Sequence, residues 1–239
     1  MRFVWKDTAT WAPLLDKTRG RRQTPETIVQ AVREIYDDLT VFHAARPQSV
    51  EAYYRGGLQL ADHNKLTATA RTIFLSGEFP ELDENAFQTA IQRVSGIDNC
   101  MGYVSLDERH LHDCCGHYLI YGSEHICGIA ASLSRNGMID YRQVLKRFGR
   151  PTVFILSLPI SKACESNLLE FGRLLRDLVP RVRAGRRAPK VDFTFTLRMD
   201  LPAGCVLAHE HPNFIKDPLL RMQPYYQLDG EEARGRYGS

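Results

Sequence analysis

Residues 102–134, GYVSLDERHLHDCCGHYLIYGSEHICGIAASLS, form the stretch from which both the fold and the function of this chain are best inferred. It holds half of the eight histidines and half of the six cysteines of the chain, namely His110, His112, His117, His125, Cys114, Cys115 and Cys127. Such a cluster is typical of a metal site, of a catalytic site or of a crowded helix. The choice among these three determines most of the functional interpretation.

The backbone signals in this stretch predict a strand followed by helix. Met101–Ser105 has the composition of a short strand, and Ser105-Leu-Asp-Glu108 matches the capping box that begins a helix. Apolar residues from Leu111 to Leu133 keep helical spacing. We therefore expect one long helix, or two helices broken near Gly116 or Gly122.

The spacing of the cluster argues against a metal site. His110-Leu-His112-Asp113 lacks the final histidine of the His-x-His-x-Asp-His run of metallo-hydrolases, and the chain has no Cys-x-x-Cys and no His-Glu-x-x-His. A thiol nucleophile, Cys114 or Cys115 beside a histidine one helical turn away, stays open. We expect no bound metal, and we interpret the cysteines mainly as reduced core residues.

The signals on either side of this stretch predict an α+β fold: a single domain over residues 1–239 with a small mixed or antiparallel central sheet flanked by helices. Thr24, followed by Pro25, is expected to cap the first helix. Residues 1–23 are expected to form an N-terminal extension, and residues 229–239 a flexible tail. Helices are expected over 24–42, 63–76, 83–94 and 168–179, and strands over 52–58, 101–105, 153–158 and 191–201.

Size and composition indicate a soluble globular protein. A chain of 239 residues with 44% hydrophobic content can bury a core, and its apolar runs are too short to cross a bilayer. The first residues, MRFVWKDTATW, lack the apolar segment of a secretory signal. We therefore expect a cytoplasmic protein with no membrane partner.

Basic residues are concentrated in two short runs, although the net charge of +3 is small. One run lies within residues 17–22. The other lies within residues 181–190 and contains no acid, only the cations Arg181, Arg183, Arg186, Arg187 and Lys190. Such runs attract phosphates of nucleic acids or nucleotides, and they also occur as solvated loops.

Three further groups of polar residues are candidates for a site. Arg55 lies at the end of a predicted short strand and precedes two glycines, where a guanidinium suits a diphosphate; a surface arginine beside a turn is the alternative. His117, Tyr121 and Glu124 share one face of the predicted helix, and a structural ion pair is the alternative there. Glu210 lies between two histidines, where it suits a general base, or it belongs to a solvated loop.

The order of these pieces resembles the ADP-ribosyltransferase superfamily, which includes bacterial toxins and antiviral defence effectors. In that family an early strand carries an Arg or His, a middle strand leads into a helix bearing Ser or Tyr, and a late strand brings a Glu. Tyr53–Leu58 looks like the first piece, and Gly102–Leu106 with the helix of Tyr118–Tyr121 looks like the second. Val191–Leu201 with Glu210 looks like the third, so the similarity covers roughly residues 50–215.

This resemblance implies an enzyme that cleaves the nicotinamide glycosidic bond of NAD and transfers ADP-ribose to a macromolecular acceptor. It implies Glu210, Tyr121 and His117 as the catalytic residues. The residues implied to bind the NAD are Arg55, Tyr54, Gly56, Tyr118 and Ser105. The acceptor, nucleic acid or protein, would bind through Arg181, Arg183, Arg186 and Arg187, and a partner that inhibits a toxic activity is expected for this type of protein.

Two other functions remain possible from the residues alone. The first is a non-enzymatic module that binds nucleic acid or protein through the runs at 17–22 and 181–190 and uses the His/Cys helix only as core. The second is a metal-dependent hydrolase. NAD binding, polyanion binding and metal content separate the three.

Overall fold

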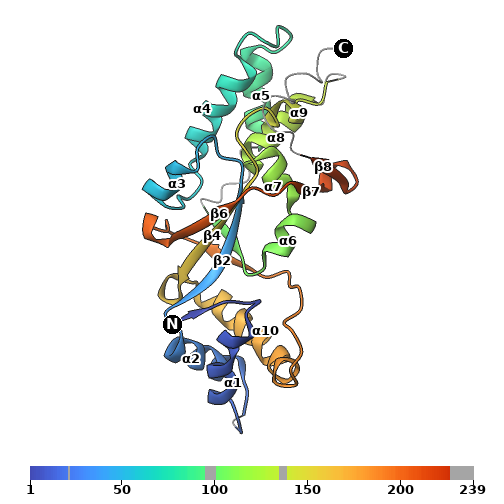
Figure 1. Ribbon diagram of the computed structural model, residues 1–239. Coiled ribbons are helices and arrows are strands. Elements are labelled where there is room, and N and C mark those ends of the chain that lie inside the picture. The colour runs from blue at the N-terminus through green and yellow to red at the C-terminus, as the bar shows by residue number, and fades with distance from the viewer. Residues whose placement is uncertain (21, 95–100, 135–138, 227–239) are drawn as a thin grey trace.

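The computed structural model describes residues 1–239 except 21, 95–100, 135–138 and 227–239 (Figure 1). The helices are α1 (Ala12–Lys17), α2 (Pro25–Ile35), α3 (Glu51–Gly56), α4 (His63–Phe74), α5 (Glu84–Val94), α6 (Glu108–Asp113), α7 (Gly116–Tyr121), α8 (Glu124–Leu133), α9 (Arg142–Leu145) and α10 (Glu165–Arg183). The strands are β1 (Arg2–Phe3), β2 (Asp38–Ala45), β3 (Gly102–Ser105), β4 (Thr152–Pro159), β5 (Thr194–Leu197), β6 (Val206–Glu210), β7 (Phe214–Asp217) and β8 (Gln223–Tyr226). The fold is mixed α+β in one domain, as predicted.

A mostly antiparallel sheet in the order β5-β3-β2-β4-β6 forms the centre, and β1 pairs parallel to the first two residues of β2. The longest pairing joins β2 to β4, from Asp38 opposite Pro159 to Ala45 opposite Thr152. A separate hairpin is formed by β7 and β8. The central sheet is therefore the antiparallel one expected from the sequence.

The helix expected over residues 24–42 is wrong in its second half. Thr24 caps α2 as predicted, but α2 ends at Ile35 and the chain becomes extended at Tyr36. Leu39 and Phe42 belong to β2 and enter different cores. Their spacing fits a helix as well as a strand covered on both faces, so the apolar pattern alone could not separate the two.

The strand expected over residues 52–58 is instead helix α3. Tyr53 lies partly buried against Phe154, with ring centroids 4.0 Å apart, and this packing favours the helix over local strand propensity. Gly57 ends the helix at a φ of +78°, and a Cβ there would lie 1.9 Å from the carbonyl oxygen of Leu201. Only glycine allows the two backbones to approach so closely.

Within residues 102–134, strand β3 is confirmed, but three short helices replace the one or two that we expected. The first break lies at Cys114 and Cys115, and the second at Gly122, whose φ is +81°. The predicted cap at Ser105 is also wrong: the N-cap of α6 is Asp107, whose carboxylate accepts from the amide of Arg109. Ser105 is the last residue of β3.

Two hydrophobic cores lie on the two sides of the sheet. Helices α1, α2 and α10 gather at one end of the molecule, and α4, α5, α8 and α9 at the other (Figure 1). Phe3, Trp5, Trp11 and Leu14 are at most 1% exposed and belong to the first core. The described part of residues 1–23 is therefore an integral part of the fold rather than an extension, because its large side chains supply core volume.

The C-terminal third differs in detail from the prediction. Helix α10 is longer than the expected 168–179 and includes Pro180 in its last turns, whereas the strand expected over 191–201 is confined to β5. Strand β6 was not predicted. The expected tail over 229–239 lies outside the described residues, and in the part that is described no helix is long and apolar enough to cross a membrane.

Candidate functional site

The central sheet opens between β2 and β3. These strands share one registered pair, Phe42 opposite Ser105, whereas β2 pairs with β4 along its whole length. At the next position of β2 the ring of His43, instead of a backbone group, contacts β3, with Nδ1 3.0 Å from the carbonyl oxygen of Tyr103. Beyond this point a cavity of about 1550 Å³ lies between the two strands and the helices around them.

This cleft is lined from both sides of the sheet. Tyr53 and Leu58 come from the side of α3, and Tyr118 and Glu124 come from α7 and α8. Pockets for drug-sized ligands typically measure about 300–1,000 Å³, so the cleft has room for a larger molecule such as a dinucleotide. We define the cleft by its lining residues in β2, β3, α4, α7 and α8 and before β5.

His43 presents a neutral imidazole to the cleft. Burial lowers its pKa, and the hydrogen bond with the Tyr103 carbonyl offsets only part of that effect. A carbonyl oxygen only accepts, so Nδ1 carries the proton and donates, and Nε2 of the neutral ring is left as an acceptor. The site therefore offers a fixed acceptor suited to a ligand hydroxyl.

Glu124 provides an organised carboxylate in the same cleft. The hydroxyl of Tyr118 donates to its Oε1 over 2.7 Å, and Nε2 of His117 lies 3.5 Å from that oxygen. Burial and the carboxylate of Glu124 raise the pKa of Tyr118, so its phenol stays a donor. Glu124 lies in the first turn of α8, near the positive end of the helix dipole.

A second carboxylate lies beside the buried end of α6. Nε2 of His110 is 3.0 Å from Oδ1 of Asp192 and 3.3 Å from the sulfur of Cys115. Both partners approach the same ring nitrogen, whereas a relay that activates a thiol needs them on opposite nitrogens. Burial also raises the pKa of Cys115 to about 11. The arrangement thus argues against Cys115 as a nucleophile.

Cys115 is expected to be alkylated slowly by iodoacetamide in the folded protein. A thiol reacts as the thiolate, and a pKa raised to about 11 keeps the thiolate fraction small at neutral pH. We expect a rate at least about 10-fold below that of exposed Cys114, rising until the pH approaches this pKa. Both cysteines lie in the tryptic fragment of residues 110–135, so tandem mass spectrometry is used to locate the label and measure each rate, and the unfolded protein is the control. Equal rates in the folded protein would indicate an activated thiol.

The other cysteines are mostly in or near the core, as predicted. Cys205 is buried, and Cys127 and Cys164 are partly buried. Cys114 is the exception because it is exposed, and Cys100 lies outside the described residues. In the described ranges, no group of three or more His, Cys, Asp or Glu side chains could hold a metal ion.

The structure brings three of the eight predicted site residues to the cleft: Ser105, Tyr118 and Tyr121. The hydroxyl of Ser105 donates to the carbonyl oxygen of Asp107 at 3.0 Å. Tyr121 is 3% exposed and donates its hydroxyl to Asp217, while Lys146 lies 5.3 Å from its ring centroid. The hydroxyl of Tyr121 is therefore engaged in holding β7 against α7.

The remaining five predicted residues do not line the cleft. Tyr54, Arg55 and Gly56 belong to α3, where Arg55 is exposed and the hydroxyl of Tyr54 lies 2.8 Å from Nδ1 of His209. His117 does not line the cleft, but it contacts two residues that do, Tyr118 and Glu124. Glu210 is the last residue of β6, with Oε1 3.4 Å from Nε2 of His112.

Sequence reasoning missed His43, the residue at the centre of the opening. A signal was present, because Leu39-Thr-Val-Phe-His43 is rich in β-branched and aromatic residues. Asp37 and Asp38 before it and Pro47 after it could also have marked the bounds of a strand. Asp192 was missed as well, because its contact with His110 joins residues far apart in the chain.

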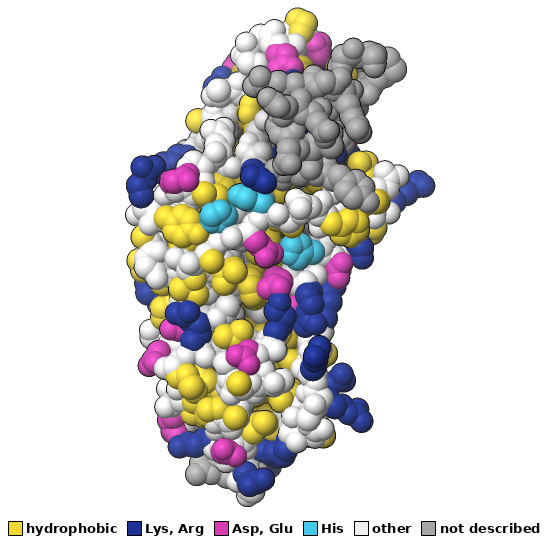
Figure 2. All heavy atoms as spheres, viewed as in Figure 1, with side chains coloured by type: hydrophobic (Ala, Val, Ile, Leu, Met, Phe, Trp, Pro, Cys, Tyr) yellow, Lys and Arg dark blue, Asp and Glu magenta, His cyan; other side chains and the backbone are white. Residues whose placement is uncertain are grey.

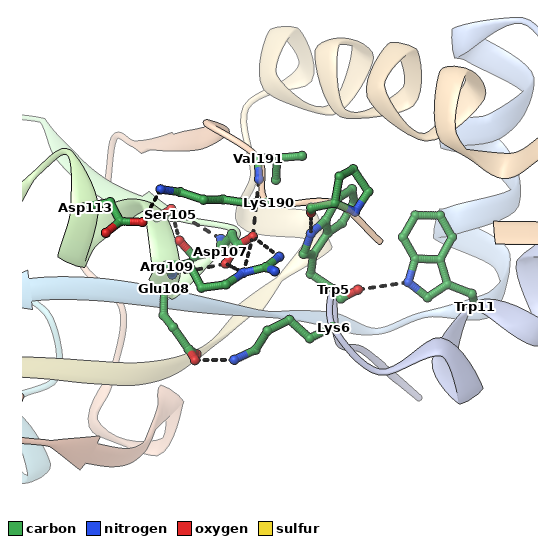
Figure 3. Close-up of polar contacts among 11 residues, drawn as sticks. Trp5, Lys6, Trp11, Ser105, Asp107, Glu108, Arg109, Asp113, Lys190 and Val191 are labelled. Atoms are coloured by element: carbon green, nitrogen blue, oxygen red, sulfur yellow. Dashed lines mark hydrogen bonds and ion pairs between the residues drawn. The ribbon is translucent and has the colours of Figure 1, made fainter. Parts of the chain in front are cut away.

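A polar network holds the chain after α10 against α6 and the N-terminal segment (Figure 3). Burial alone would raise the pKa of Asp107, but the guanidinium of Arg109 and the backbone amides of Arg109 and Val191 together outweigh it, so the pKa lies below its ordinary value. Asp107 also accepts from the amide of Val191 at 3.3 Å. The indole of Trp5 donates to the carbonyl of Pro189 at 2.9 Å. The loop before β5 is thus anchored at its C-terminal end.

Comparison with protein-family models, with curated proteins and with solved structures found no match to this chain.

Proposed function

We propose that the cleft between β2 and β3 binds NAD and that the protein is an ADP-ribosyltransferase-like enzyme. The observation that carries this proposal is the position of His43, whose Nδ1 lies 3.0 Å from the carbonyl oxygen of Tyr103 where the sheet opens. It supports the resemblance, in which an early strand carries an Arg or His and a middle strand leads into a helix bearing Ser or Tyr. Here β2 carries His43, and β3 leads through α6 into α7 with Tyr118.

The reaction breaks the bond between C1′ of the ribose and the nicotinamide nitrogen, and nicotinamide leaves with the bonding electron pair. The acceptor's nucleophile then bonds to C1′ and loses its proton to solvent or a nearby carboxylate. The ribose passes through a state resembling an oxocarbenium ion, which a fixed negative charge stabilises. Glu124 supplies that charge in our proposal, because it is a carboxylate of the cleft already oriented by Tyr118.

The cleft also contains groups suited to the rest of NAD. Nε2 of His43 would accept a hydrogen bond from a ribose hydroxyl, and the ring of Tyr118 would stack on nicotinamide. Lys65 and Arg93 line the cleft and would bind the diphosphate. The sequence analysis assigned diphosphate binding to Arg55 instead. In the family that the chain resembles, a late strand carries a Glu. The acid of the cleft that best corresponds to it is Asp192, which lies just before β5.

At NAD concentrations below KM, replacing His43 by alanine is expected to lower the rate of nicotinamide release by about 10-fold, because the loss of a single hydrogen bond weakens NAD binding. Release is measured by chromatography with saturating protein acceptor mixtures and also without acceptor, since water can take the acceptor's place. His112→Ala, an imidazole that does not line the cleft, is the matched control and should keep the wild-type rate. Absence of release by the wild-type protein under every condition contradicts the proposed function.

A further inference from the structure

The two basic runs, far apart in the sequence, meet at one end of the molecule. A guanidinium nitrogen of Arg183, at the end of α10, donates to the carbonyl oxygen of Leu15 at 2.9 Å and lies 3.3 Å from the hydroxyl of Thr18. Leu15 is in α1, and Thr18 follows it directly. On the face that Figure 2 shows, Lys and Arg side chains lie around the end of the molecule that carries α1 and α10 in Figure 1.

Part of this charge has a structural use. Lys17 pairs with Glu34 at 2.8 Å, Lys190 pairs with Asp113, and Arg183 joins the two helices. Cations at the C-terminal ends of helices are also stabilised by the helix dipole, and both α1 and α10 end here. These three residues therefore need no external partner.

Five other arginines of the two runs have no such structural contact with an acid among the described residues. All of them are exposed, and none has an ion pair with an acid in the described part of the chain: Arg19, Arg22, Arg181, Arg186 and Arg187. We call this set the arginine surface. Arg21 of the first run lies outside the described residues.

The loop after α10 brings its arginines together. Gly185 turns the chain at a φ of +75°, and Nε of Arg181 then lies 3.4 Å from the carbonyl oxygen of Arg187. The loop is held farther on by the Trp5 contact to Pro189 and by the Asp107 contact to Val191 (Figure 3). The guanidinium groups are thus displayed on a fixed backbone, which limits the entropy lost when a ligand orders them.

The chemistry of the arginine surface fits phosphates. Guanidinium groups bind phosphate oxygens in pairs, and a row of them suits a backbone with regularly spaced charge. None of the large hydrophobic side chains that are exposed among the described residues lies within the two runs. Protein interfaces bury an apolar centre, and single-strand binding uses aromatic stacking, so neither kind of partner matches this surface as well as a duplex does.

We infer that the arginine surface binds the phosphate backbone of duplex nucleic acid. The contact is made to phosphates, so it does not depend on base sequence and weakens as salt is added. The inference does not rest on NAD binding, and the two sites lie on different elements of the fold. Failure of one proposal therefore leaves the other standing.

The test is fluorescence anisotropy of the full chain with labelled duplex DNA and duplex RNA of one sequence, over a series of salt concentrations and without NAD. The triple variant Arg181→Ser, Arg186→Ser, Arg187→Ser is expected to bind at least about 10-fold more weakly and to lower the log–log salt slope by about 2.7, since each phosphate contact contributes about 0.9. The control Arg55→Ser, Arg71→Ser, Arg147→Ser removes the same charge from elsewhere. It should keep wild-type affinity within about 2-fold, because only non-specific attraction changes.

The possible results either support or overturn the inference of duplex binding. Binding of either duplex with loss confined to the first variant supports the inference, and the two probes distinguish DNA from RNA. Equal loss in both triple variants overturns it, because net charge alone would then explain binding. Preferential binding of a polyglutamate peptide also overturns it in favour of an acidic protein. All exchanged arginines are exposed or partly exposed, and thermal unfolding of each variant verifies that it folds.

Discussion

The Glu124→Gln variant is expected to release nicotinamide from NAD about 10²–10³-fold more slowly than the wild-type protein, the usual loss when one preorganised electrostatic group is removed. The exchange keeps the shape of the side chain and an oxygen able to accept from Tyr118, but it removes the negative charge. That charge matters most in the cationic transition state, so kcat should fall while the affinity for NAD changes little. Initial rates over a range of NAD concentrations separate the two quantities.

Two further variants sharpen this result. Tyr118→Phe removes the hydrogen bond that orients Glu124 and should give an intermediate loss, whereas Glu210→Gln should keep the wild-type rate because Glu210 does not line the cleft. The opposite pattern, with Glu210→Gln inactive and Glu124→Gln active, would contradict the role of Glu124 and would indicate Glu210 as the catalytic carboxylate, as the sequence resemblance implies.

The Trp11→Ala variant is expected to lose about 3–5 kcal/mol of unfolding free energy, the range for large aromatic residues deleted from a core. The side chain of Trp11 is fully buried. Its ring centroid lies 5.2 Å from those of Phe3 and Trp5, and its indole donates to the carbonyl oxygen of Trp5 at 3.1 Å. Alanine leaves a cavity and an acceptor without its donor. Urea denaturation followed by circular dichroism measures the loss.

Met199→Ala is the control for this measurement, because Met199 is 50% exposed and should change stability by no more than about 0.5 kcal/mol. A loss below about 1 kcal/mol for Trp11→Ala would contradict this account, because it would show that the N-terminal segment contributes little to the free energy of unfolding, as expected of an extension.

Local signals were sufficient for much of the fold. The Thr24 cap, the apolar spacing of α4 and α5 and the mostly apolar sequence of β4 each lie within one short segment, and each was predicted correctly in type. Strand β2 was not, because its side chains enter cores on both faces and mimic helical spacing. Strand β6 gave no signal because it is short and only its first residue, Val206, is buried.

The site was harder to predict, because the residues that line the cleft come from distant segments. Ser105, Tyr118 and Tyr121 lie in one stretch and were found from it. Arg55 was placed on an expected strand, and α3 puts it instead on an exposed helix. The role of His43 could not be predicted from the sequence, because it depends on the single registered pair between β2 and β3, which determines where the sheet opens.

Calorimetric titration of NAD into the wild-type protein and into His43→Ala tests the central claim most directly, because it measures binding in the cleft without requiring an acceptor. We expect saturable binding at one site in the wild-type protein and an affinity about 10-fold lower in the variant, equivalent to about 1.4 kcal/mol. No measurable binding to the wild-type protein, or equal affinity in both proteins, would contradict the assignment of the cleft between β2 and β3 as an NAD site.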